Sequence, residues 1–296
     1  MFRISPLSEK EKDYLILQNS NNSSSARISL HQGGSLQELK LKDIYLIKEQ
    51  ENFDYEVSYA SSILFPFCSR IKKGVYKFKE EKYQLALNDN GKSALHGLVY
   101  DKYFEVFEPE EHQDNCSVTV NYFEKDLNIG FPFKFFISTT YTLFDTELQV
   151  RVTVKNMDTK AFPFTLGWHP YFISNQLEKS SLTFKSDKKV KFSKNLIAKK
   201  IVEINQEENF NIENKQLDDC FFLNDDKVKF TTPNYGIEIS SNAKENFLQL
   251  YTPQGLPLIA IEPMTGISDS FNNKIGLQVL EPKETYVITW KVKLMK

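Results

Sequence analysis

Four polar residues capable of binding or acid–base chemistry stand in apolar surroundings. His169 lies in LGWHPYF and Glu262 in LIAIEPMTG, while His96 lies in ALHGL and Arg70 ends LFPFCSR. Burying a charged side chain costs several kcal/mol unless the charge is paired or serves a function. Arg70 and Glu262 therefore need either an ion pair in the core or a role in a site.

Two interpretations of these residues remain open at this point. In the first, an Arg70–Glu262 ion pair and two core histidines with satisfied hydrogen bonds only stabilise the fold. In the second, His169 and Glu262 exchange protons with a ligand. Each of these two residues precedes a proline, which favours extended backbone and is consistent with a strand that ends at the rim of a groove.

A groove that combines aromatic rings with arginine, histidine and glutamate suits a neutral polyhydroxylated ligand. The C–H face of a sugar ring packs on aromatic rings, and sugar hydroxyls form directional hydrogen bonds. The aromatic residues predicted to line the groove are Phe65, Phe67, Trp168, Tyr171 and Phe172. We therefore expect a sugar as the ligand.

Alternation of apolar and polar residues predicts the strands that must position these side chains. It runs along residues 148–155 and again along residues 286–294, which indicates half-buried strands. Turn-forming stretches at 89–93 and 252–257 separate further short strands. Strands do not alternate with helices, which argues against a parallel α/β fold. The sequence therefore predicts an all-β fold.

Chain length and the lack of a linker predict one domain over residues 1–296. The polar stretch 19–27 is interpreted as a surface turn between two early strands. Residues 205–219 are polar and irregular, and they predict a long loop that could form the rim of a site.

Composition argues against several classes of protein. The formal net charge is −2 and no long basic run is present, so we expect no nucleic-acid partner. No apolar stretch has the length of a signal peptide core or a membrane span, and we expect a cytoplasmic protein that binds no membrane. Cys68, Cys116 and Cys220 lie far apart and without metal-ligand spacing, which predicts neither disulfides nor a zinc site.

Five motifs in order resemble those of the aldose 1-epimerase family, the galactose mutarotase-like proteins. They are LFPFCSRI (64–71), LHG (95–97), LGWHPYF (166–172), LDDCF (217–221) and IAIEPMTGISDSFN (259–272). The resemblance implies that family's supersandwich, a large antiparallel β-sandwich with a cleft across one sheet. It also implies interconversion of the α and β anomers of a free aldohexose.

The resemblance implies roles for individual residues. Glu262 matches the family's general base, His169 its general acid and His96 its second active-site histidine. Serine at position 69 departs from the asparagine that many members have directly before the arginine, which leaves the identity of the sugar open. The residues predicted to bind the sugar are Arg70, Trp168, and either Asp218 or Asp219.

The implied reaction moves only protons, so we expect no metal and no organic cofactor. The expected partner is a monosaccharide, and the expected assembly is a monomer or homodimer. One alternative is an epimerase of phosphorylated hexoses, for which Lys72 and Lys73 are the nearest extra cations. Another is a non-catalytic carbohydrate-binding module on the same fold. A hydrolase or lyase would need paired carboxylates at the cleft.

Overall fold

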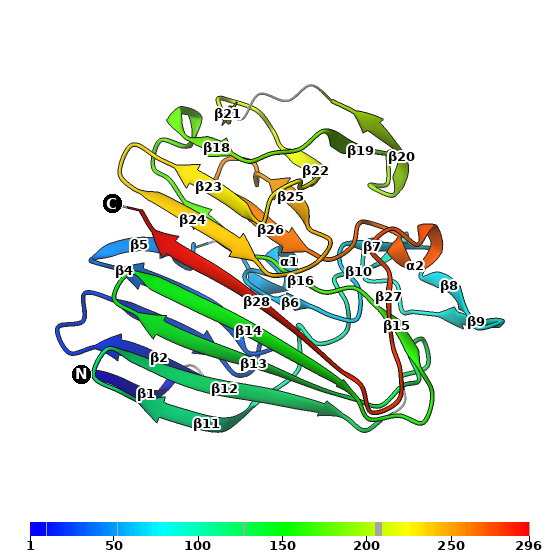
Figure 1. The fold of residues 1–296 in the computed structure, drawn as a ribbon, viewed down its shortest axis with the longest axis horizontal. Coiled ribbons are helices and arrows are strands. Elements are labelled where there is room, and N and C mark those ends of the chain that lie inside the picture. Colours follow the sequence, from blue (N-terminus) through cyan, green and yellow to red (C-terminus); the bar gives the residue numbers. More distant parts are fainter. Residues whose placement is uncertain (10, 52, 127, 205–208, 296) are drawn as a thin grey trace.

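Antiparallel sheets form almost all of the regular structure (Figure 1). The structure is a computed structural model that describes residues 1–9, 11–51, 53–126, 128–204 and 209–295. It confirms the predicted all-β class. The described helices are short, namely α1 (Tyr55–Ser58), α2 (Ser270–Asn273) and a 3-10 turn (Leu177–Lys179). Among the described residues, no helix is long and apolar enough to cross a membrane.

Three large sheets and three two-stranded sheets make up the architecture. The five-stranded sheet contains, in spatial order, β1 (Phe2–Glu9), β2 (Lys12–Asn19), β3 (Ser25–Ser29), β4 (Ser35–Leu41) and β5 (Ile44–Ile47). The nine-stranded sheet contains β11 (Glu105–Glu111), β12 (Asn115–Glu124), β13 (Phe135–Phe144), β14 (Glu147–Asn156), β28 (Thr285–Leu294), β24 (Gly236–Ser241), β23 (Lys227–Thr231), β18 (Ser181–Thr183) and β21 (Asn209–Asn211).

The third large sheet and the small sheets carry the residues singled out above. The eight-stranded sheet contains β20 (Ala198–Glu203), β19 (Lys188–Phe192), β22 (Asp218–Phe222), β25 (Phe247–Tyr251), β26 (Leu258–Met264), β16 (Gly167–Trp168) and β6 (Ile63–Leu64), with β17 (Tyr171–Ile173) also paired to β26. The small sheets pair β7 (Arg70–Lys72) with β10 (Ser93–Leu95), β8 (Val75–Phe78) with β9 (Glu81–Gln84), and β15 (Phe162–Phe164) with β27 (Gln278–Leu280).

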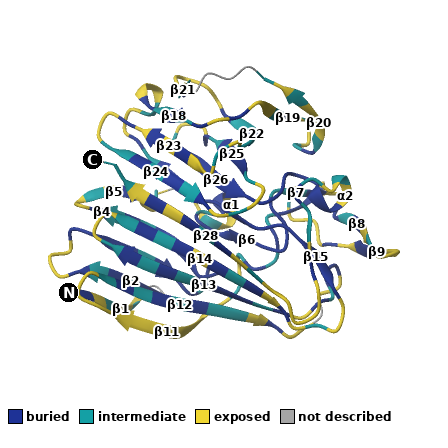
Figure 2. Cartoon of the chain, viewed as in Figure 1, coloured by how far each residue is buried: buried dark blue, intermediate teal, exposed yellow. Residues whose placement is uncertain are grey.

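The two strands predicted from alternation lie side by side in the nine-stranded sheet. Val150 of β14 pairs with Trp290 of β28, and burial alternates along both strands (Figure 2). Their inward side chains belong to one hydrophobic cluster, whose members come from the whole length of the sequence between Phe2 and Val292. Both predicted strands are confirmed, because one face of each packs on the core while the other carries polar residues.

The outermost strand of the nine-stranded sheet, β11, is polar and exposed. Its sequence EVFEPEE is exposed at every residue, and it pairs with β12 through a register shift between Val106 and Glu108. At the other end of this sheet, β21 falls inside the stretch 205–219 that was predicted to be a long loop, and β22 begins within the same stretch. That prediction is therefore wrong for Asn209–Asn211 and for Asp218 and Asp219. Residues 205–208 of the stretch lie outside the described residues.

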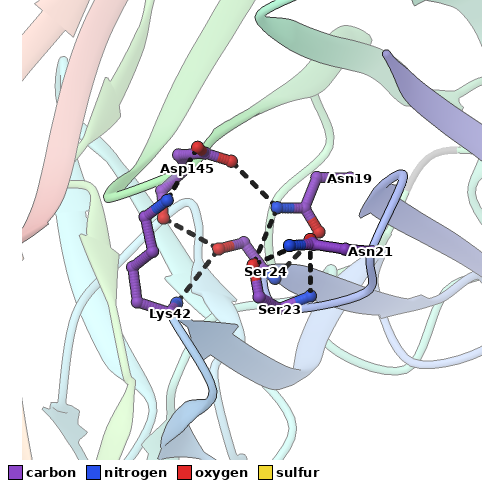
Figure 3. A network of polar contacts seen from close by, with 6 residues as sticks. All are labelled: Asn19, Asn21, Ser23, Ser24, Lys42 and Asp145. Carbon is purple, nitrogen blue, oxygen red and sulfur yellow. Dashed lines mark hydrogen bonds and ion pairs between the residues drawn. The ribbon is translucent and has the colours of Figure 1, made fainter.

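Polar contacts anchor the turn between β2 and β3. Asn19 Nδ2 donates to Asp145 Oδ1 at 2.9 Å, and Lys42 Nζ lies 2.8 Å from Asp145 Oδ2 (Figure 3). Ser24 Oγ donates to the backbone oxygen of Asp145 at 2.8 Å. The predicted turn is confirmed, but Ser23 and Ser24 are buried rather than at the surface, because the turn is tied to turns of two other hairpins.

We expect Asp145→Ala to lower the free energy of unfolding by about 1–2 kcal/mol, because the buried side chain of Asn19 loses an acceptor and the exposed Lys42 loses its ion-pair partner. Chemical denaturation measures the change. Asp114→Ala serves as the control, since Asp114 is exposed and accepts from its neighbour Asn115. Equal stability of the two variants contradicts a structural role for this network.

Candidate active site

A cavity of about 360 Å³ lies against the face of the sheet that carries β22, β25, β26 and β17. Its lining brings together residues from five of the six predicted polar positions, far apart in the sequence. The polar side chains in the lining include Arg70, His96, His169, Asp218, Gln249 and Glu262. These side chains form the candidate active site.

Strand register decides which side chains face the cavity. Gln249 of β25 pairs directly with Glu262 of β26, and Asp218 of β22 pairs with Tyr251 of β25. Side chains that are directly opposite in neighbouring strands share a face, and successive residues alternate between faces. These four residues therefore point into the cavity, while Ile261 joins the core.

His169 and Glu262 form the most buried polar pair in the cavity. His169 Nε2 lies 3.4 Å from Glu262 Oε1, and the two side chains are 5% and 3% exposed. Within the described residues, His169 Nδ1 and Glu262 Oε2 have no hydrogen-bond partner. Buried polar atoms that only support a fold are nearly always paired. In the part of the chain that the structure describes, His169 Nδ1 therefore lacks the hydrogen bond that a satisfied core histidine would have.

The β7–β10 sheet brings Arg70 and His96 to the same end of the cavity. Leu95 pairs with Arg70, and the ring centroids of His96 and His169 lie 5.0 Å apart at 77°. Arg70 Nε lies 2.8 Å from Asp89 Oδ2. The alternative of an Arg70–Glu262 ion pair is therefore wrong. The carboxylate that pairs with Arg70 is Asp89, and Glu262 lies beside His169 instead.

The two candidate aspartates face different surroundings. Asp218 lines the cavity and accepts from Gln249 Nε2 at 2.7 Å. Asp219 Oδ1 instead lies 2.6 Å from Lys189 Nζ. Alternation along β22 separates them. The geometry therefore favours Asp218 as the residue that contacts a ligand.

Trp168 lies in the core rather than at the cavity, contrary to the prediction. It is fully buried and stacks on Trp290, with ring centroids 6.2 Å apart. Alternation turns Trp168 away from the face to which its neighbour His169 points. Of the five aromatic residues predicted to line the groove, Tyr171 does so. The other residues that pack in the core are Phe65, Phe67 and Phe172.

The cavity has aromatic and amide residues that the motifs did not predict. Tyr59 and Tyr251 line the cavity beside the predicted Tyr171, whose ring stacks on that of His169 at 5.0 Å and 27°. Gln249 had a usable signal, since it is an amide within the apolar strand FLQLY. No local sequence pattern distinguished Tyr59 and Tyr251 from aromatic residues of the core.

Burial sets the protonation of the central pair. It lowers the pKa of His169 to about 4 and, together with nearby His169 and Arg70, lowers the pKa of His96 well below its usual value. Burial and then Asp218 raise the pKa of Glu262 well above its usual value, and Arg70 opposes this. Burial therefore outweighs Arg70 in its effect on the pKa of Glu262. Of the two groups of the pair, Glu262 holds a proton more readily than His169.

Among the residues that the structure describes, no group of three or more His, Cys, Asp or Glu side chains is placed to hold a metal ion. Cys68, Cys116 and Cys220 are buried free thiols.

The lowered pKa of His169, about 4 against 6.5, makes stability depend on pH. Between these values the unfolded chain binds a proton that the folded chain does not, so stability falls as the pH drops from 6.5 towards 4. We expect His169→Asn to make this fall shallower by up to about 1.4 kcal/mol per pH unit. Urea unfolding at several pH values measures the slope. The exposed residue His112 supplies the control, His112→Asn, which keeps the wild-type slope.

Comparison with known proteins gives the family. The chain matches the family model for aldose 1-epimerase over residues 14–293. It belongs to the aldose 1-epimerase family. The resemblance of the five motifs is thus confirmed, and the family places the chain among isomerases that act on sugars.

Relatives match most of the length of this aldose 1-epimerase family member at low sequence identity. It is 25% identical over 262 residues to the uncharacterized protein YihR of Escherichia coli K12, covering 84% of this chain and 83% of YihR. It is 24% identical over 260 residues to the plasmid-encoded LacX protein of Lactococcus lactis, covering 80% of this chain and 84% of LacX.

Solved structures of similar fold cover the whole chain. A galactose mutarotase-like protein from Clostridium acetobutylicum superposes with a TM-score of 0.87 at 18% identity, covering 100% of this chain and 99% of the other. A galactose 1-epimerase from Lactobacillus acidophilus superposes with a TM-score of 0.83 at 17% identity, covering 100% and 98%. The galactose mutarotase-like fold is therefore that of this chain.

Proposed function

We propose that this protein is an aldose 1-epimerase that interconverts the α and β anomers of a free aldohexose. The observation that carries the proposal is the buried His169–Glu262 pair at 3.4 Å in the wall of a cavity. One nitrogen and one oxygen of the pair have no partner among the described residues, so they remain available to sugar oxygens. Family membership supports the class of reaction.

Anomer exchange needs a base at the C1 hydroxyl and an acid at the ring oxygen. In the proposal, Glu262 takes the hydroxyl proton while His169 protonates the ring oxygen, and the ring opens to the aldehyde. Rotation about C1–C2 and the reverse proton transfers give the other anomer. Each positioned acid or base of this kind contributes on the order of 10²–10⁴-fold to the rate.

Glu262 can act as the base and His169 as the acid although both are buried, because the pair shares one proton that can move between them. In the empty cavity Glu262 holds a proton in preference to His169, because burial raises the pKa of the carboxyl and lowers that of the imidazole. Sugar hydroxyls that donate to Glu262 stabilise the carboxylate and lower this pKa. Binding of the sugar therefore moves the proton to His169, and the pair enters the reaction as carboxylate and imidazolium without exchanging a proton with solvent.

The charges of the cavity favour a neutral sugar over a phosphorylated one. Within the described lining, Arg70 is the sole arginine or lysine, and it is already paired with Asp89. Two acids, Asp218 and Glu262, face the same space. A phosphate group adds negative charge and would need further cations, and Lys72 is exposed outside this lining.

Polarimetry on freshly dissolved pure anomers of several aldohexoses tests the function. We expect the protein to accelerate mutarotation with a chelator present, and His169→Asn and Glu262→Gln each to reduce kcat by about two or more orders of magnitude. The double variant should lose little more than either single one, since both residues serve one proton transfer.

Sugar binding without turnover provides the contrasting outcome. If no aldohexose relaxes faster than in buffer while calorimetry still detects binding, the protein is a carbohydrate-binding module. If His169→Asn lowers the melting temperature but leaves the activity of the folded fraction unchanged, His169 is a structural residue and the proposed acid is wrong.

The two adjacent aspartates allow a matched test of sugar contact. Asp218→Asn removes the charge that faces the cavity, and we expect KM to rise by about tenfold, as for the loss of a hydrogen bond to a charged group. Asp219→Asn alters a partly exposed pair with Lys189, and KM should change by less than about twofold. The opposite ranking assigns the contact to Asp219.

A further inference from the structure

Asn88 holds the backbone directly before His96. Its Oδ1 accepts from the Leu95 N–H at 2.7 Å, and its Nδ2 donates to the Leu95 carbonyl oxygen at 3.0 Å. These are the two hydrogen bonds that the backbone of a paired antiparallel strand makes to one residue. On its other side Leu95 pairs with Arg70. The β7–β10 sheet has two strands, and the side chain of Asn88 makes the hydrogen bonds to β10 that a third strand would otherwise make.

Asn88 also reaches the ring that packs on His96, Tyr59, and the ring behind it, Tyr100. Its Nδ2 lies 3.2 Å from the Tyr100 hydroxyl and 3.5 Å from the Tyr59 hydroxyl. The Tyr59 ring packs against the His96 ring at 4.9 Å, and Tyr100 packs edge-on against Tyr59 at 4.9 Å. One carboxamide therefore contacts both the backbone that carries His96 and the hydroxyls of these two rings.

The next residue, Asp89, holds Arg70. Its Oδ2 lies 2.8 Å from Arg70 Nε, and the side chains are 17% and 19% exposed. A turn fixes Asp89 in place, since its N–H donates to the Ser93 carbonyl at 3.2 Å and its own carbonyl accepts from the Lys92 N–H at 2.9 Å. The ion pair is largely shielded from water, so it constrains the guanidinium more than a surface pair would.

The backbone at His96 has a conformation that needs external support. His96 has φ of 60° and Ser69, whose carbonyl accepts from the His96 N–H at 2.9 Å, has φ of 51°. A left-handed backbone is unfavourable for a non-glycine residue and persists where the surroundings hold it in place. The Asn88 contacts to Leu95 supply that support on the side opposite Arg70.

We propose that Asn88 and Asp89 are positioning residues of the active site, with Asn88 orienting His96 and Asp89 orienting Arg70. Because the two residues are consecutive at the start of one turn, a single segment fixes the positions of both His96, the predicted active-site histidine, and Arg70, the predicted sugar-binding arginine. The kinetic consequence of this inference rests on the proposed epimerase function, whereas its structural consequence does not.

Kinetics of single variants test the division of labour. Asn88→Ala should lower kcat about tenfold with KM within about twofold, because a small displacement of a reacting group slows the reaction more than it weakens binding. Asp89→Asn should raise KM about fivefold with kcat nearly kept, because the Arg70 guanidinium loses its charged partner. Asn90→Gly and Asp187→Asn are the controls, since both residues are exposed, and both variants should match the wild type.

Nuclear magnetic resonance of the imidazole rings tests the structural part without turnover. The chain has four histidines, so individual ring signals can be assigned. The His96 signals should move in Asn88→Ala and stay in place in Asn90→Gly, while those of His31 and His112 stay in place in both. This outcome stands even if no aldose is turned over.

Two results overturn the inference. In the first, Asn88→Ala keeps both the wild-type His96 signals and the wild-type kcat. In the second, its loss of activity equals its loss of folded protein by melting temperature, with the remaining folded enzyme fully active. Absence of mutarotation in the wild type, with shifted His96 signals in Asn88→Ala, instead rejects the proposed function and keeps the positioning role.

Discussion

A carboxylate in the middle of a fully buried strand is the constraint on which the site depends. All seven residues of β26 are buried, and Glu262 faces the cavity while Ile261 packs into the core. A carboxyl group in such a place either stays protonated and neutral or, when ionised, needs polar partners. His169 Nε2 lies 3.4 Å from Glu262 Oε1 and the guanidinium of Arg70 is nearby, while Glu262 Oε2 has no partner among the described residues.

The sequence was sufficient where one physical signal dominated. Residues 148–155 and 286–294 alternate because one face of each strand packs on the core, so both strands could be predicted without any long-range information. The motifs around Arg70, His96 and Glu262 were predicted to converge through the family resemblance, since sequence spacing alone carries no topology. The structure brings these three residues to one cavity, although their catalytic roles remain predictions.

The sequence was insufficient where register or a distant contact decided the outcome. Asp218 and Asp219 differ only in the face of β22 that they occupy, and a shift of one residue exchanges those faces. Trp168 could equally have lined a groove or filled the core, because β16 is too short for its alternation to be recognised. The pairing of Arg70 with Asp89 joins a strand to a turn 19 residues away, and no local pattern indicates it.

The character of β11 affects how the protein behaves at high concentration. An outermost strand exposes unpaired N–H and C=O groups, which can recruit a strand from another molecule. In β11, Pro109 has no N–H to offer, and four glutamates among seven exposed residues repel a second copy of the same edge. This repulsion raises the free energy of the associated molecules and leaves the free energy of a separate native molecule unchanged. The charge and the proline of β11 therefore oppose edge-to-edge association at this edge of the nine-stranded sheet.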